Sequence, residues 1–164
     1  MRSLTEIDGL LAADKSLYGN PDWIEDGSVA KLASPLVDLH GDIIGGLTLK
    51  LSAPIETMLQ RGTAVLILDR HPIQRLSFMP DHSHGNKGKY PVPPELRLRV
   101  APADRSRIYR WVDNRAWPTE DNMGAARLLE TEPATLRDAF NLFLETCVIS
   151  AYLPDPPHRP KLEF

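Results

Sequence analysis

Apolar residues at the start of the chain have the spacing of one helix face. The residues with this spacing are Leu4, Ile7, Leu10 and Leu11. Ser3 precedes them and Glu6 stands three residues further on, which is the Ser-x-x-Glu pattern of a helix N-terminus. The sequence therefore predicts a short amphipathic helix over about residues 4–16.

In the middle of the chain the spacing of apolar residues changes from helical to alternating. Leu47, Leu49 and Leu51 alternate with polar residues, and strict alternation is typical of an antiparallel strand with one buried face. The run 64–68 is continuously apolar, which fits either a strand covered on both faces or a half-buried strand. Further strand-like segments lie at 36–39, 43–44, 73–79, 96–100 and 107–112. We expect about six strands in a meander.

The last third of the chain returns to helical spacing. A short helix is predicted over 122–130, and Pro133 suits the first turn of a longer helix, where its missing N–H costs nothing. An apolar stripe follows at Leu136, Phe140, Phe143, Leu144, Cys147 and Val148. This stripe should pack across the sheet, with Cys147 as a small buried hydrophobic residue. The pattern predicts one α+β domain over residues 1–164: an antiparallel, meander-like sheet of about six strands, with an N-terminal helix and C-terminal helices packed on one face.

Composition narrows the class of protein. The chain has 164 residues, of which 42% are hydrophobic and 25% charged, as is ordinary for a globular domain with its own core. Its one cysteine excludes an internal disulfide and fits a reducing compartment. No apolar run reaches the ~20 residues of a membrane span, and the N-terminus carries acidic residues without the apolar core of a signal peptide. We expect a soluble, cytoplasmic protein that does not enter membranes.

Charge is distributed unevenly along the chain. Residues 70–115 contain ten Lys or Arg and four Asp or Glu, a net charge of +6 in a chain whose total is −3. Such a segment attracts an anionic ligand when its cations share a face. The alternative is that the basic and acidic parts neutralise each other across the fold.

Residues 69–89 hold three of the five histidines, and His82-Ser83-His84 is the sharpest feature among them. Residues i and i+2 of an extended chain point to the same side, so both imidazoles would face one ligand. The two residues that precede and follow this trio, Asp81 and Gly85, are typical of a loop.

Three interpretations of this pair remain open. In the first, His82 and His84 bind a metal ion, with Asp81 or Asp113 as a third ligand. In the second, one of them is the general acid or base of metal-free phosphodiester cleavage, which suits an imidazole with an ordinary pKa of about 6.5. The phosphate would then be stabilised by cations such as Arg75, Lys87 or Arg110. In the third, residues 80–88 form a polar loop whose histidines are solvated.

The segment Tyr109-Arg110-Trp111 interleaves two aromatic rings with a cation, a combination that stacks on bases and contacts phosphate. In the strand predicted over 96–100, two arginines share one face. Together these features predict a nucleic-acid-binding or anion-binding surface made of Lys87, Arg97, Arg99, Tyr109, Arg110 and Trp111. The alternative is that the aromatic residues belong to the core and that the arginine pairs with Asp113 or with a helix acid.

Residues 107–115, Arg-Ile-Tyr-Arg-Trp-Val-Asp-Asn-Arg, resemble a strand of TumE-like toxins from bacterial type II toxin–antitoxin pairs. Those toxins carry a similar strand that ends in Arg-aromatic-Asp-Asn, with a His-rich segment close by. Over about 20–164 the chain is also similar to a family of uncharacterised small bacterial proteins, through the loop at 81–86 and the C-terminal helix followed by Pro-Pro. The first resemblance implies a toxin with a cognate antitoxin as its partner. The second implies a fold and no activity.

The leading hypothesis is a small metal-independent ribonuclease, the toxin of a toxin–antitoxin pair, with RNA as its substrate and no cofactor. His82 or His84 would transfer protons, and Arg75 would contact the phosphate. The rival hypothesis is a non-enzymatic module that binds nucleic acid or an acidic protein through the basic sheet face, with binding that weakens steeply with salt. A metal-dependent hydrolase that uses His82 and His84 is the third.

Overall fold

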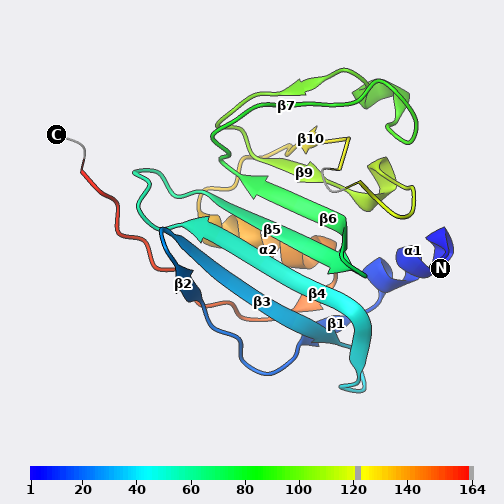
Figure 1. Cartoon of the computed structure of the whole chain (residues 1–164), viewed down its shortest axis with the longest axis horizontal. Helices are drawn as coiled ribbons and strands as arrows, with labels where there is room; N and C mark the ends of the chain where they lie inside the picture. The colour runs from blue at the N-terminus through cyan, green and yellow to red at the C-terminus, as the bar shows by residue number, and fades with distance from the viewer. Residues whose placement is uncertain (121–122, 163–164) are drawn as a thin grey trace.

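The computed structural model describes residues 1–120 and 123–162, in which the chain forms an α+β fold built on one large sheet (Figure 1). The helices are α1 (Leu4–Ala12) and α2 (Leu136–Thr146), with single 3-10 turns η1 (Pro94–Leu96) and η2 (Trp111–Asp113). The strands are β1 (Lys15–Leu17), β2 (Ile24–Asp26), β3 (Val29–Val37), β4 (Ile43–Pro54), β5 (Gly62–Leu68), β6 (His71–Phe78), β7 (His84–Gly85), β8 (Val100–Ala101), β9 (Arg107–Tyr109), β10 (Arg127–Leu128) and β11 (Ile149–Ser150).

Nine of the described strands form the large sheet, in the order β10-β9-β6-β5-β4-β3-β1-β11, with β2 paired to β3. All of these pairs are antiparallel except β1–β11, which is parallel. Strands β7 and β8 pair separately with each other. The predicted α+β class and the mostly antiparallel sheet are confirmed, but the sheet has nine strands rather than about six. The additional strands at its edges are two or three residues long, too short to show a period.

One face of the sheet packs on α2 and holds most of the core. In β5, Ala64, Leu66 and Leu68 are fully buried on this face, whereas Val65 and Ile67 are partly exposed on the other. Helix α2, which lies behind β5 in Figure 1, contributes Leu136, Phe140, Phe143 and Leu144 to the same core. The apolar run 64–68 is therefore a half-buried strand, the second of the two predicted arrangements.

The prediction of a basic strand pair at 96–100 and 107–112 is wrong. Turn η1 ends at Leu96, and the residues of β8 pair with the short strand β7 instead of with β9. Three prolines in the segment 91–94 lack backbone donors, and Leu98 has a left-handed φ of 62°, which a regular strand does not contain. Strand β9 is also short, because the chain turns into η2 at Trp111.

Helix α1 begins where the sequence predicts, because Ser3 Oγ accepts a hydrogen bond from the Glu6 N–H at 3.1 Å. It ends at Ala12 rather than near residue 16, since Lys15 already belongs to β1. The buried Lys15 amine donates to carbonyl oxygens of the last helical turn, where those oxygens have no intrahelical partner.

The C-terminal third differs from the prediction in one helix. Residues 123–130 contain the strand β10 and no helix, while residue 122 lies outside the described part of the chain. The N–H groups of Ala125 and Ala126 are bound by the side-chain oxygens of Asn114 and Asn86, so they are not available to a helix. Helix α2 carries the predicted apolar stripe from Leu136 to Leu144, whereas Cys147 and Val148 follow its last turn.

Helix α2 starts at Leu136, three residues after Pro133, so the proline is not at its first helical position. Thr135 is its N-cap and accepts a hydrogen bond from the Asp138 N–H at 3.1 Å, so Pro133 precedes the helix. Cys147 follows the last turn and is fully buried, as the apolar stripe predicts.

Candidate functional site

Residues 79–106 leave the sheet after β6 and return to it as β9, and we call them the β7–β8 lobe. In Figure 1 this lobe stands at the top of the view, beyond β6 and β9. Two hydrogen bonds close its neck. The Met79 N–H donates to Ser106 Oγ (3.1 Å), and the Asp104 N–H donates to the Pro80 carbonyl oxygen (2.7 Å). The lobe thereby carries His84 back beside the sheet.

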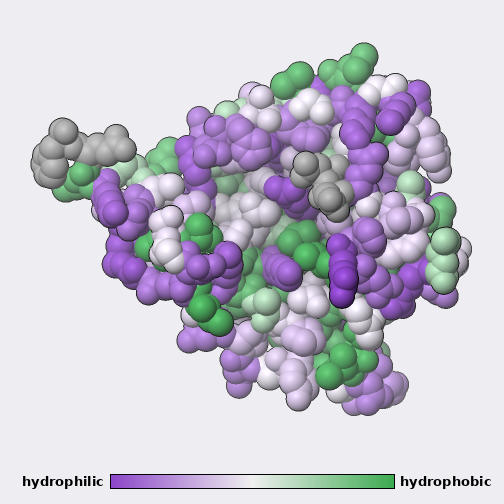
Figure 2. Space-filling model, in the orientation of Figure 1, coloured by the Kyte–Doolittle hydropathy of each residue, from purple (hydrophilic) through white to green (hydrophobic). Residues whose placement is uncertain are grey.

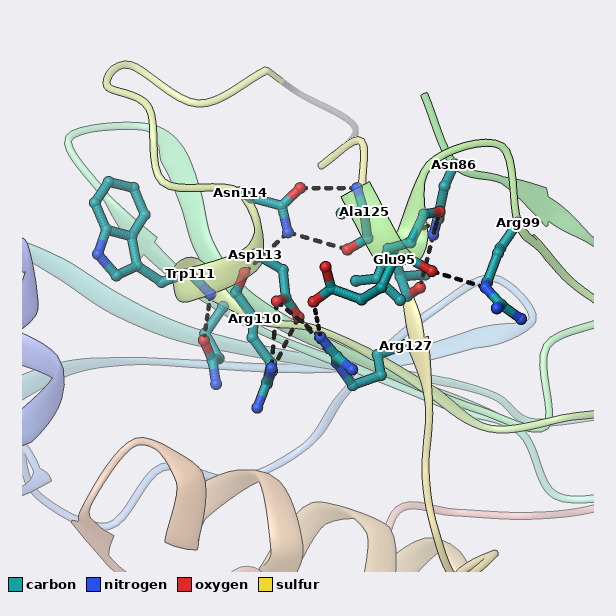
Figure 3. Close-up of polar contacts among 12 residues, drawn as sticks. Asn86, Glu95, Arg99, Arg110, Trp111, Asp113, Asn114, Ala125 and Arg127 are labelled. Carbon is teal, nitrogen blue, oxygen red and sulfur yellow. Dashed lines mark hydrogen bonds and ion pairs between the residues drawn. The ribbon is translucent and has the colours of Figure 1, made fainter. Parts of the chain in front are cut away.

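Two buried asparagines hold the chain that follows η2, and one of them, Asn86, ties it to the lobe (Figure 3). Asn86 Nδ2 donates to the carbonyl oxygens of Leu96 (3.0 Å) and Ala126 (2.9 Å), and Asn86 Oδ1 accepts from the Ala126 N–H (2.8 Å). Asn114 binds both the N–H and the carbonyl of Ala125 in the same way. Because these amides replace strand pairing, the lobe has a defined position despite its few regular elements.

Four side chains meet where the lobe covers β6 and β9, and we call them the His84 cluster: Arg75, His84, Arg107 and Tyr109. Arg75 and Tyr109 stand opposite each other in the register of β6 and β9. The His84 ring meets the Tyr109 ring edge-on, with centroids 5.1 Å apart, and the guanidinium carbon of Arg75 lies 5.3 Å from the same Tyr109 centroid. An imidazole and a guanidinium thus contact one aromatic ring.

Arg107 is the buried support of this cluster. It is 1% exposed, and its Nε donates to Tyr109 Oη at 3.0 Å. Its Nη1 donates to the His82 carbonyl oxygen at 3.1 Å, which ties the lobe to β9. In the described part of the chain no carboxylate pairs with Arg107 or Arg75, so the cluster carries uncompensated positive charge.

Two nitrogen atoms of the cluster are buried without a partner. These atoms are Nε of Arg75 and Nε2 of His84, and neither has a hydrogen bond within the described residues. Buried polar atoms of native proteins are nearly all hydrogen-bonded, so each exception calls for an explanation. Here the two exceptions belong to side chains that contact the same ring, which points to a shared polar ligand.

The surroundings of His84 favour its neutral form. Burial is the main reason that the pKa of His84 is lowered from its ordinary value, and the guanidiniums of Arg107 and Arg75 add to the effect. The nearby backbone of Gly124 opposes this change. At neutral pH the ring is therefore uncharged and suited to accept a proton.

His82 does not share the burial of its neighbour. It is exposed, and its Nδ1 lies 3.0 Å from Asp81 Oδ1. The other carboxylate considered as a metal ligand, Asp113, is bound to two arginines. Among the residues that the structure describes, no three His, Cys, Asp or Glu side chains gather as a potential metal site.

Three basic residues predicted to bind nucleic acid are engaged elsewhere in the lobe. Lys87 forms an ion pair with Glu120. Arg97 Nε donates to the Val92 carbonyl oxygen (2.9 Å), and Arg99 Nε donates to the carbonyl oxygen of Glu95 (2.7 Å; Figure 3). The two arginine bonds stabilise the lobe's own turns, and none of the three contacts brings its cation to the His84 cluster.

Arg110 and Trp111, the other two candidates of this surface, also make structural contacts. Arg110 Nε donates to Asp113 Oδ2 at 2.9 Å, and Arg127 donates to the same carboxylate (Figure 3). Burial opposes ionisation of Asp113, but its hydrogen bonds with the two arginines hold its pKa below the ordinary value. Trp111 is buried, with its indole N–H donating to Asp8 Oδ1 at 2.7 Å, so its ring is not an exposed stacking surface.

The structure thus brings together Arg75, His84 and Tyr109 from the predicted set and adds Arg107, which the sequence analysis did not select. Period-two alternation was the signal that would have found it, because Arg107 lies on the same face of β9 as Tyr109. Tyr109 itself is 3% exposed, which makes it a buried support rather than a stacking platform.

Comparisons of the chain with protein-family models, with curated proteins and with solved structures found no match. Neither described helix is long and apolar enough to cross a membrane.

Proposed function

We propose that the protein is a metal-independent ribonuclease whose His84 cluster holds and cleaves a phosphodiester. The observation that carries this proposal is the pair of buried, unpartnered nitrogen atoms, Arg75 Nε and His84 Nε2, whose side chains contact one tyrosine ring. A guanidinium donates to phosphate oxygens, and a neutral imidazole nitrogen accepts a proton. Together they supply charge stabilisation and proton transfer, which metal-free cleavage of RNA requires.

In the proposed reaction, neutral His84 accepts the proton of the ribose 2′-hydroxyl. The 2′-oxygen forms a bond to phosphorus, the bond from phosphorus to the 5′-oxygen breaks, and that oxygen takes a proton from His82, the proposed general acid. Arg75 stabilises the negative charge that develops on the phosphate. The products are a 2′,3′-cyclic phosphate and a free 5′-hydroxyl.

Tyr109 and Arg107 act as positioning residues in this proposal. Tyr109 sets the distance between the imidazole and the guanidinium, because both rest against its ring. Arg107 holds the tyrosine hydroxyl and the His82 carbonyl at the same time, so it fixes the backbone of His82 relative to β9.

The test is RNA cleavage by the purified protein in the presence of EDTA. We expect the wild-type protein to cleave RNA and to leave DNA of the same sequence intact, because DNA lacks the 2′-hydroxyl. His84→Gln should lower the rate by about 10²–10⁴-fold, the usual contribution of a general base. His40→Gln is the matched control, since His40 is exposed in the turn before β4. Absence of cleavage by folded wild-type protein, or cleavage that needs an added divalent metal, would refute the proposal.

Growth of a bacterial host gives a second readout of the same proposal, in which the protein acts as the toxin of a toxin–antitoxin pair. Expression of the wild-type chain alone should arrest growth, whereas the His84→Gln variant at equal protein level should not. Equal growth arrest by both would contradict a toxic role for the cleavage reaction.

A further inference from the structure

The face of the sheet opposite α2 is covered by no helix in the described residues, and we call it the open face; Figures 1 and 2 look onto it. Its middle is formed by residues of β4 and β5 that alternate with the buried ones. Those used below are Thr48, Lys50, Ser52, Thr63, Val65 and Ile67. The surface is therefore a mixture of hydroxyl, apolar and cationic side chains, as the mixed colours of Figure 2 show.

Strand register joins this face to the His84 cluster. Lys50 of β4 is opposite Val65 of β5, Val65 is opposite Arg75 of β6, and Arg75 is opposite Tyr109 of β9. Because neighbouring strands lie about 4.8 Å apart, Lys50 is about 10 Å from Arg75 along this row. One straight row thus leads from an exposed lysine to the cluster.

The charged residues that the four central strands bring to this face are all cationic. Strands β3, β4, β5 and β6 together contain Lys31, Lys50 and Arg75 and no Asp or Glu, in a chain whose net charge is −3. Lys31 is paired with Asp26 of β2 (2.8 Å), but in the described residues Lys50 and Arg75 have no carboxylate partner. Unpaired cations in one row complement a chain of regularly spaced anions.

We propose that the open face is the path along which a single-stranded RNA reaches the His84 cluster, with Lys50 binding a phosphate upstream or downstream of the one held by Arg75. This inference rests on the proposed function and adds that the RNA substrate is single-stranded.

A single strand fits the face better than a duplex does. Val65 lies between the two cations, and Ile67 follows it on the same face of β5. Both give unpaired bases an apolar surface, while Thr63 and Ser52 offer hydroxyl groups for hydrogen bonds. A duplex hides its base faces and presents phosphate and sugar alone to a flat surface. An acidic polypeptide would pair with the lysine, but it has no phosphodiester to place in the cluster.

The experiment measures binding of a short, single-stranded 2′-O-methyl RNA at several salt concentrations. This probe lacks the 2′-hydroxyl, so it reports binding whether or not the protein cleaves RNA. For single strands each phosphate contact contributes a slope of about −0.7 to log K against log salt. Lys50→Gln should make the slope shallower by about 0.7, and the same holds for Arg75→Gln. Lys161 lies in the C-terminal segment and is paired with Glu56, so Lys161→Gln should leave the salt slope unchanged.

The outcomes separate this inference from the proposed reaction. An unchanged salt slope in Lys50→Gln refutes the proposed RNA path over the open face, even if the protein cleaves RNA in EDTA. The expected slope change in a protein that cleaves no RNA supports the path and refutes the reaction. Equal affinity for a duplex of the same length, or tighter binding of polyglutamate, overturns the choice of single-stranded RNA.

Kinetics give an independent check on Lys50. Because this lysine lies two strands from Arg75, its replacement should raise KM for single-stranded RNA and leave kcat unchanged. A lower kcat at unchanged KM would place Lys50 in the chemical step and contradict its role in the path. Lys50 is exposed, so Lys50→Gln should fold like the wild type, as circular dichroism would verify.

Discussion

Replacement of Asn86 by alanine tests how the lobe is held beside the sheet. The Asn86 amide is 6% exposed and makes three hydrogen bonds of 2.8–3.0 Å. Alanine would leave the Leu96 carbonyl and both backbone groups of Ala126 without these partners. Each bond contributes about 1 kcal/mol net, and each stranded buried group costs about 1–3 kcal/mol unless water reaches it. We therefore expect Asn86→Ala to lower the free energy of unfolding by about 3–5 kcal/mol.

Urea unfolding followed by circular dichroism measures this loss as a shift of the midpoint at constant m-value. Asn141→Ala is the matched control, because Asn141 is exposed on α2 and its removal should change stability by less than about 0.5 kcal/mol. Asn86→Asp should also destabilise the fold, since its second carboxylate oxygen would face two carbonyl oxygens. A loss below about 1 kcal/mol in Asn86→Ala would refute the view that this amide fixes the lobe.

Three further predictions concern other residues. Because burial and nearby guanidiniums lower the pKa of His84, its contribution to stability is complete above about pH 6.5 and is lost as the pH falls toward the folded-state value. His84→Gln should therefore show a weaker loss of stability on mild acidification in urea titrations; an identical pH dependence would contradict this. Burial raises the pKa of Cys147 to about 12, so a thiol reagent should label it only after unfolding, and rapid labelling of the folded protein would disprove its burial. Arg97→Ala and Arg99→Ala should leave the rate of RNA cleavage unchanged, because both side chains bond to the lobe's own backbone. A large loss of cleavage in either variant would show that the arginine belongs to the RNA-binding site.

The central strands and the main helix could be predicted because their local patterns agree with their surroundings. Alternation along β4 matches one buried and one exposed face, and the apolar stripe of α2 matches the sheet that it covers. The apolar run of β5 left two arrangements open, because periodicity alone does not say what covers Val65 and Ile67. The structure decides between them through the exposure of these two residues.

The lobe could not be predicted from local pattern. The alternation at 96–100 is typical of a strand, yet prolines before it and the left-handed backbone of Leu98 favour turns. Asn86 and Asn114 then supply from their side chains the bonds that strand partners would have made, and such bonds join residues far apart in sequence. The local spacing of residues 123–130 does not reveal that two of their backbone N–H groups are bound by distant asparagine side chains.

For the candidate site, sequence reasoning selected Arg75, His84 and Tyr109, which the structure places together. It could not assign burial, and burial separates His84 from His82 and makes Tyr109 a support instead of a stacking surface. Arg107 was passed over because its role depends on the His82 carbonyl oxygen, 25 residues away in sequence. The catalytic role of the cluster remains a prediction.

Replacement of one ribose in an RNA substrate tests the central claim most directly. In buffer with EDTA, we expect the wild-type protein to leave a 2′,3′-cyclic phosphate at each cleaved linkage. A single 2′-deoxynucleotide should block cleavage at the linkage on its 3′ side alone, and Arg75→Gln should slow cleavage at all linkages. Cleavage at the deoxy-substituted linkage, or intact RNA after incubation with folded wild-type protein, would contradict a reaction in which His84 activates the 2′-hydroxyl.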